Sequence, residues 1–70
     1  MVDMEYVDSS NIEMVGYDPE AMELHVKFRS CEEPYVYEGV PEQVHEEFMA
    51  APSKGSYLNR VLKGVYNFHR

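Results

Sequence analysis

The segment PSKGSYLNR, residues 52–60, combines residue types that could bind a phosphate group. Ser53 is a good N-cap, and a helix starting there would present backbone N–H groups beside the Lys54 ammonium. On this segment alone we favour a capped helix with a solvated basic face, because the full phosphate loop G-x-x-x-x-G-K-[ST] is absent. Anion binding is the functional alternative. Its candidate residues are Ser53, Lys54, Gly55, Ser56, Tyr57, Asn59, Arg60 and Lys63.

The charge of the chain is strongly uneven along its length. The net charge is −7, and all thirteen acidic residues precede Phe48. The remaining third contains only basic charges, on Lys54, Arg60, Lys63 and Arg70. Net charge opposes long-range attraction to nucleic acid, but the local potential near the basic end can be positive within a Debye length of about 8 Å. Any contact with nucleic acid is therefore expected at the basic C-terminal third.

The chemistry-bearing side chains do not form a recognisable catalytic or metal-binding pattern. The three histidines, His25, His45 and His69, fall on different expected elements, and none has a second ligand at metal spacing. Cys31 is the single cysteine, which excludes an internal disulfide and fits a reducing compartment. With no nucleophile motif or plausible catalytic triad, we expect a non-enzymatic protein without metal, cofactor or small-molecule substrate.

Two stretches in the first half predict antiparallel strands. Residues 22–29 alternate apolar and polar side chains, which indicates a strand with one buried face; its apolar positions are Met22, Leu24, Val26 and Phe28. Residues 11–17 also suit a strand, but Ile12 and Val15 fall on opposite faces of a strict alternation. A bulge or burial on both sides would reconcile them, and Gly16 is a candidate position for the irregularity. The turn DPEA, residues 18–21, connects the two strands.

A third strand and two helices complete the expected domain. Residues 35–37 form the short strand YVY, and Pro41 suits the first turn of a helix that ends before Pro52. The second helix starts at Ser53 and ends near Gly64; its apolar positions are Leu58, Val61, Leu62 and Val65. We predict one α+β domain over residues 1–70: a three-stranded antiparallel meander followed by two helices packed on one face. Residues 1–8 are expected to be a flexible acidic lead-in and residues 67–70 an irregular tail.

The face of the third strand decides the role of Tyr35 and Tyr37. If they point with Leu24 and Val26, they belong to the core; if they point with His25 and Lys27, they form a platform on which bases could stack. We favour the core, because Val36 alone could not close that side of a small domain.

The runs SSNIEMVGYD, LHVKF, YVYEGVP and APSKGSYLNRVLKGVY, in this order and spacing, resemble the KTSC domain. This family is named for its place at the C-terminus of some lysyl-tRNA synthetases and also occurs as small stand-alone proteins. The resemblance runs from Ser9 to about Tyr66. It implies no established function, although the synthetase association has suggested RNA binding. No synthetase catalytic domain is present in these residues, so aminoacylation does not transfer.

Two functions follow as expectations. The first is RNA binding through the basic C-terminal helix and the loop before it. The alternative is a protein interaction through the outer sheet face or an edge strand. No apolar run approaches the roughly 20 residues that cross a bilayer, so we expect a cytoplasmic protein without a membrane partner.

Overall fold

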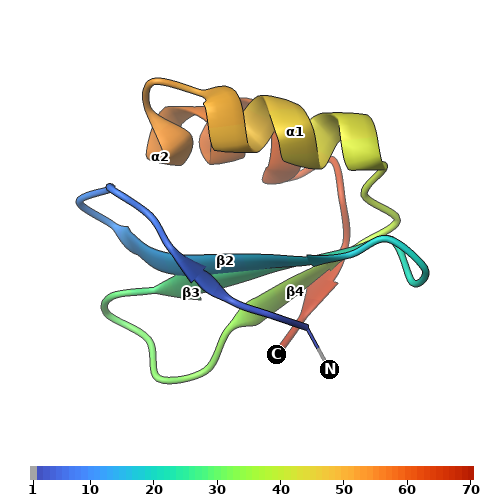
Figure 1. The fold of residues 1–70 in the computed structure, drawn as a ribbon, viewed down its shortest axis with the longest axis horizontal. Helices are drawn as coiled ribbons and strands as arrows, with labels where there is room; N and C mark the ends of the chain where they lie inside the picture. The colour runs from blue at the N-terminus through green and yellow to red at the C-terminus, as the bar shows by residue number, and fades with distance from the viewer. Residues whose placement is uncertain (1) are drawn as a thin grey trace.

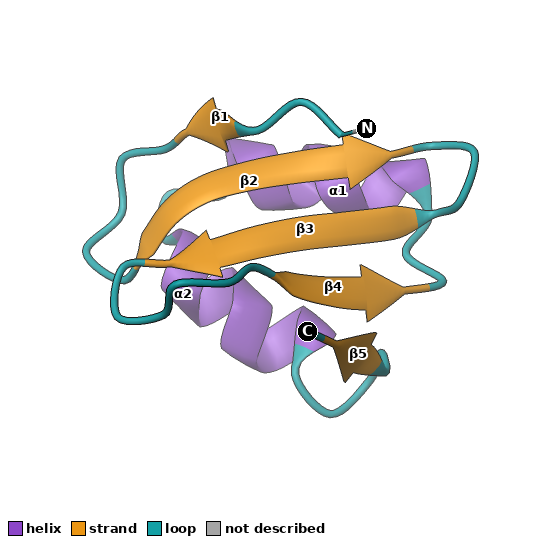
Figure 2. Cartoon of the chain, turned by 90° about the horizontal axis from the view of Figure 1, so that it is seen from below, coloured by secondary structure: helices purple, strands orange, loops and turns teal. Residues whose placement is uncertain are grey.

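The computed structural model describes residues 2–70 and shows a sheet covered on one face by helices (Figure 1). All neighbouring strands are antiparallel, in the order β1-β2-β3-β4-β5. Figure 2 shows the open face of this sheet, with the helices behind it. The predicted α+β class and the packing of both helices on one face are confirmed. The elements are β1 (Glu5–Tyr6), β2 (Ile12–Asp18), β3 (Glu23–Phe28), β4 (Tyr35–Glu38), α1 (Glu42–Ala50), α2 (Lys54–Tyr57), the π-helix η1 (Leu58–Leu62) and β5 (Phe68–His69).

The sheet has two more strands than the predicted meander, and both lie in segments for which no strand was predicted. Phe68 and His69 pair with Tyr37 and Val36 of β4, so the prediction of an irregular tail at 67–70 is wrong. Glu5–Tyr6 pairs with β2, within the part expected to be a flexible lead-in; Met1 lies outside the described residues. Two-residue strands have no detectable alternation, because the pairing partner rather than the local sequence defines them.

The predicted bulge is present in β2. The register between β2 and β3 shifts between Ile12 and Met14. The extra residue lets both Ile12 and Val15 lie in the core, fully buried. Glu13, at the bulge, accepts a 2.9 Å bond from the Lys27 ammonium. This bond, together with the Lys27 charge, lowers the pKa of Glu13.

Gly16 is not the site of that bulge, contrary to our expectation. It lies in regular pairing opposite His25. A Cβ at this position would lie 2.6 Å from side-chain atoms of Val2 and Met4 and 2.8 Å from the carbonyl oxygen of Asp3. Glycine is therefore required because the N-terminal segment packs directly against the backbone of β2.

The turn between β2 and β3 begins as predicted but extends one residue further. The Asp18 carboxylate accepts bonds from the backbone N–H groups of Glu20 and Ala21. Met22 then adopts a left-handed conformation, with φ 56°, and its side chain is 42% exposed. The prediction that Met22 belongs to the buried face is wrong because this backbone conformation ends the alternation before β3 begins.

The two tyrosines of β4 point into the helix-covered side of the sheet. Tyr37 pairs with Leu24, and Tyr35 pairs with Val26, so each tyrosine shares the face of its buried partner. The predicted core orientation is confirmed. Tyr37 is only 4% exposed, whereas Tyr35 is half-buried near the edge strand β5.

Two helical segments cover this face of the sheet, and the second changes along its length from an α-helix to a wider π-helix. Phe48 of α1 is fully buried, and Ser53 caps α2 as predicted. From Leu58 the helix becomes a π-helix, in which the Lys63 N–H donates to the Leu58 carbonyl at 2.8 Å. Val65 is 66% exposed, so the prediction of an apolar stripe reaching Val65 is wrong. The wider turn and the left-handed Gly64 (φ 82°) move Val65 off the core face.

Within residues 2–70, no helix is long and apolar enough to span a membrane.

Candidate functional site

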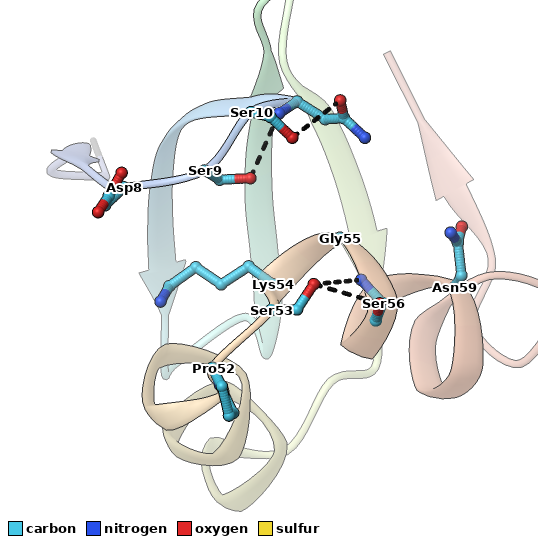
Figure 3. A pocket seen from close by; sticks show the side chains of 10 residues that line it. Asp8, Ser9, Ser10, Pro52, Ser53, Lys54, Gly55, Ser56 and Asn59 are labelled. Carbon is cyan, nitrogen blue, oxygen red and sulfur yellow. Dashed lines mark hydrogen bonds between the residues drawn. The ribbon is translucent and has the colours of Figure 1, made fainter.

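A polar pocket of about 350 Å³ lies between the loop before β2 and the start of α2. Figure 3 shows Ser10 on one side of it and Ser53, Ser56 and Lys54 on the other. Most of its lining side chains carry a hydroxyl, amide or charged group. They are Asp8, Ser9, Ser10, Asn11, Pro52, Ser53, Lys54, Gly55, Ser56 and Asn59.

Backbone N–H groups at the start of α2, on one side of this pocket, already form hydrogen bonds within the protein. The Ser53 hydroxyl accepts from the Ser56 N–H at 3.4 Å, and the Tyr57 N–H donates to the Ser53 carbonyl at 3.1 Å. The backbone N–H groups of Ser56 and Tyr57, at the predicted helix start, are therefore already bonded. The Lys54 ammonium and the Asp8 carboxylate lie in the same lining, whereas the serine hydroxyls already form hydrogen bonds within the protein. This composition suits contact with a polar ligand better than specific binding of an anion.

Tyr57 is a core residue, which corrects its place among the candidate binding residues. It is 7% exposed, and its ring packs against Phe48 with centroids 5.8 Å apart. Its hydroxyl donates to the Glu47 carboxylate at 2.9 Å. Burial, followed by this hydrogen bond, raises the pKa of Tyr57.

A second cavity, of about 430 Å³, lies beside β4, β5 and the π-helix. We call it the aromatic groove. Its lining consists of Phe28, Ser30, Cys31, Tyr35, Tyr37, Leu58, Asn59, Lys63 and Phe68.

Four aromatic rings in this groove contact one another. Tyr35 stacks on Phe68 with centroids 4.9 Å apart and an interplanar angle of 22°. Phe28 meets Tyr35 edge-on at 5.2 Å, and Tyr37 lies 5.6 Å from Phe68. Phe68 nevertheless remains 51% exposed. The cluster therefore combines a fixed set of rings with an accessible aromatic surface.

Two basic side chains, Lys63 and Arg70, lie close to these rings. The Arg70 guanidinium lies 4.7 Å from the centroid of the Tyr35 ring, within the range of a cation–π contact. Lys63 lines the groove, while Arg60 lies 6.0 Å from the centroid of the Tyr57 ring. Among residues 2–70, none of Lys54, Arg60, Lys63 and Arg70 forms an ion pair with a carboxylate.

Sequence reasoning missed the contributions of Phe28, Phe68 and Arg70. Ser53, Lys54, Gly55 and Ser56 of the predicted residues line the polar pocket. Tyr35, Tyr37 and Lys63 line the groove, Asn59 lines both cavities, and Arg60 lines neither. Phe28 was assigned only to the core, and the segment containing Phe68 and Arg70 was predicted to be irregular. The pairing of β5 with β4 brings Phe68 and Arg70 to Tyr35, which Phe28 of β3 also contacts.

The three histidines have separate surroundings. His25 lies 3.5 Å from Glu23, His45 stacks on Tyr17 at 4.6 Å, and His69 lies 2.7 Å from Glu38. In the part of the chain that the structure describes, no group of three or more His, Cys, Asp or Glu side chains could hold a metal ion.

These features define a small α+β domain with a five-stranded antiparallel sheet and helices on one face. The KTSC domain model matches residues 8–66, and the chain belongs to this family. The crystal structure of a KTSC domain protein from Yersinia pestis is similar, with a TM-score of 0.94 and 38% identity. That alignment covers 100% of this chain and 97% of the other.

Relatives of similar length have uninformative names. An uncharacterized protein of Stutzerimonas stutzeri is 40% identical over 57 residues, which are 81% of this chain and 79% of the relative. A lysine–tRNA ligase of Nostoc punctiforme is 33% identical over 63 residues, which are 90% of this chain but only 11% of the ligase. The family is therefore shared by small proteins and by one region of much larger ligases.

Proposed function

We propose that this domain binds RNA through its basic C-terminal third. The observation that carries the proposal is the set of basic side chains after α1 that have no carboxylate partner within residues 2–70: Lys54, Arg60, Lys63 and Arg70. In the acidic part of the chain, Lys27 is paired with Glu13, and Arg29 donates to the Ser9 carbonyl oxygen rather than to a carboxylate. Unpaired cations on a short segment without acids are available to phosphates.

The lysine–tRNA ligase of Nostoc punctiforme supports this proposal by association. The name of that enzyme implies a tRNA substrate, and one of its regions is homologous to this chain. Fold-level analogy raises the expectation of RNA without locating a contact, and the unpaired cations supply the candidate contacts.

The alternative, a protein interaction through the outer sheet face or an edge, has weaker structural support. Both edge strands contain only two residues, which gives little template for strand addition. Residues 2–4 also pack against Gly16 on β2. A protein partner would give binding that survives nuclease and high salt.

The test is the salt dependence of binding to a labelled single-stranded RNA oligomer, measured by fluorescence anisotropy. Lys54→Gln with Arg60→Gln should weaken binding and make the slope of log K against log salt shallower by about 1.4, since each single-strand phosphate contact contributes about 0.7. The control, Ala21→Glu with Gln43→Glu, lowers the net charge by the same amount at exposed positions outside both cavities.

The control pair separates a local contact from a general charge effect. The proposal predicts that only the Lys54 and Arg60 pair reduces the slope. Equal effects of the two pairs, or no binding of wild-type protein at low salt, would overturn it.

A further inference from the structure

We propose that the aromatic groove receives one unstacked base of the bound RNA, with Lys63 and Arg70 contacting the neighbouring phosphates. This inference rests on the proposed RNA binding and adds a location and a mode of contact. Its starting point is the groove of about 430 Å³ lined by four aromatic rings and by Lys63 and Asn59.

The exposed ring of Phe68 is the first argument. A phenylalanine that is 51% exposed leaves apolar surface in water, although its position is fixed by stacking on Tyr35 at 4.9 Å. Single-stranded nucleic acid is bound by such fixed rings, because every base offers a flat face for stacking. An aromatic surface held by β4 and β5 needs little ordering when a base arrives.

Charge complementarity is the second argument for a nucleic acid rather than an apolar ligand. Arg70 lies 4.7 Å from the Tyr35 ring centroid, and Lys63 lines the groove. Neither forms an ion pair among the described residues 2–70. A base bound between them would place its phosphates next to two cations, whereas an apolar ligand would leave both charges unused.

The π-helix explains why these groups lie together. Its hydrogen bond joins Leu58 to Lys63, residues five positions apart, and both line the groove. In a regular α-helix, residues with this spacing point in clearly different directions. The widened turn therefore brings Lys63 to the apolar groove. Asn59, in the same turn, lines both the groove and the polar pocket, and its amide can donate to and accept from a base edge.

The experiment compares a uridine oligomer with an abasic oligomer that carries the same number of phosphates. Wild-type protein should bind the uridine oligomer more tightly, because the abasic chain offers nothing to stack. Phe68→Ala should reduce affinity for the uridine oligomer by about 5- to 150-fold, the range measured for single stacking contacts. It should leave affinity for the abasic oligomer unchanged.

Two further variants separate stacking from loss of structure. Phe68→Tyr keeps an aromatic face and should keep the preference for the base-bearing oligomer. Phe68→Leu keeps an apolar side chain but has no ring, so it should lose the preference for the base-bearing oligomer. Circular dichroism during heating verifies that each variant remains folded at the assay temperature.

The outcomes distinguish this inference from the proposed function. If the wild type binds both oligomers equally and the Lys54 and Arg60 pair still matters, RNA binding stands and the groove is not its base site. If Phe68→Leu retains the full preference for the base-bearing oligomer, the inference that a base stacks on the Phe68 ring is wrong. If the wild type binds neither oligomer, the proposed function fails, and the groove inference fails with it.

Discussion

The hydroxyl of Tyr57 donates a 2.9 Å hydrogen bond to the Glu47 carboxylate and so joins α2 to α1. The bond is partly buried, and the Tyr57 ring packs against Phe48. Tyr57→Phe keeps this packing and removes the bond. We expect the free energy of unfolding to fall by about 0.5–1.5 kcal/mol, the usual net value of such a bond. Urea unfolding followed by circular dichroism measures the change. Tyr6→Phe, at an exposed position, is the control and should change little.

Three partly or fully buried tyrosines predict a loss of stability in alkali. Burial is the main cause that raises the pKa of Tyr17, Tyr37 and Tyr57. A second group raises each pKa further. It is the Glu42 charge for Tyr17, the neighbouring Tyr35 for Tyr37, and the hydrogen bond to Glu47 for Tyr57. A raised pKa means that the unfolded chain ionises first. The stabilisation is complete below the unfolded value of about 10 and is lost as the pH rises through the folded values.

The near-ultraviolet absorbance of tyrosinate tests this directly, because the chain has six tyrosines and no tryptophan. The folded protein should develop this absorbance at higher pH than the chain unfolded in urea. Tyr57→Phe should remove the contribution of one late-ionising tyrosine. Coincident curves for the folded and unfolded chains would contradict the prediction.

The sequence predicted the parts of the fold that local chemistry controls. Failed alternation between Ile12 and Val15 indicated either a bulge or burial on both sides, and the structure has the bulge, with both side chains buried. Ser53 was predicted as an N-cap from its hydroxyl alone. The alternation of residues 22–29 was extended to Met22, where the turn conformation rather than hydrophobicity sets the side-chain direction.

The candidate site was less predictable because it depends on contacts between distant segments. Lys54 and Lys63 were identified from their charge and local sequence. The stacking of Tyr35 on Phe68 depends on β5, whose two residues show no pattern of their own. Likewise, nothing in a helical periodicity indicates where an α-helix widens into a π-helix, so the exposure of Val65 could not be foreseen.

The contact between Gly16 and the N-terminal segment gives a prediction about packing. Gly16→Ala would place a methyl group within 2.8 Å of the Asp3 carbonyl oxygen. We expect a loss of about 1–3 kcal/mol in the free energy of unfolding, typical of overpacking. Gly55→Ala is the matched control: its nearest atom is the Asn11 amide nitrogen at 3.7 Å, and alanine favours the helix. Thermal unfolding compares the two variants.

Deleting residues 2–4 provides an internal check on the cause of this loss. In the shortened chain, Gly16→Ala should cost much less, because the segment that it displaces is gone. An equal cost in the long and short chains would show that the loss comes from β2 itself.

The left-handed conformation of Met22 predicts a stabilising substitution. Among residues 2–70 it is the only non-glycine residue with positive φ, at 56°, and its carbonyl accepts a 2.8 Å bond from the Val40 N–H. Met22→Gly keeps this backbone bond and relieves strain of about 1–2 kcal/mol, offset in part by about 0.4–1 kcal/mol of added chain entropy in the unfolded state. We expect a net gain of up to about 1.6 kcal/mol in urea unfolding. The neighbouring Ala21→Gly adds the same entropy without relieving strain, so it should destabilise the domain. If both glycine variants lose stability equally, the Met22 backbone is not strained.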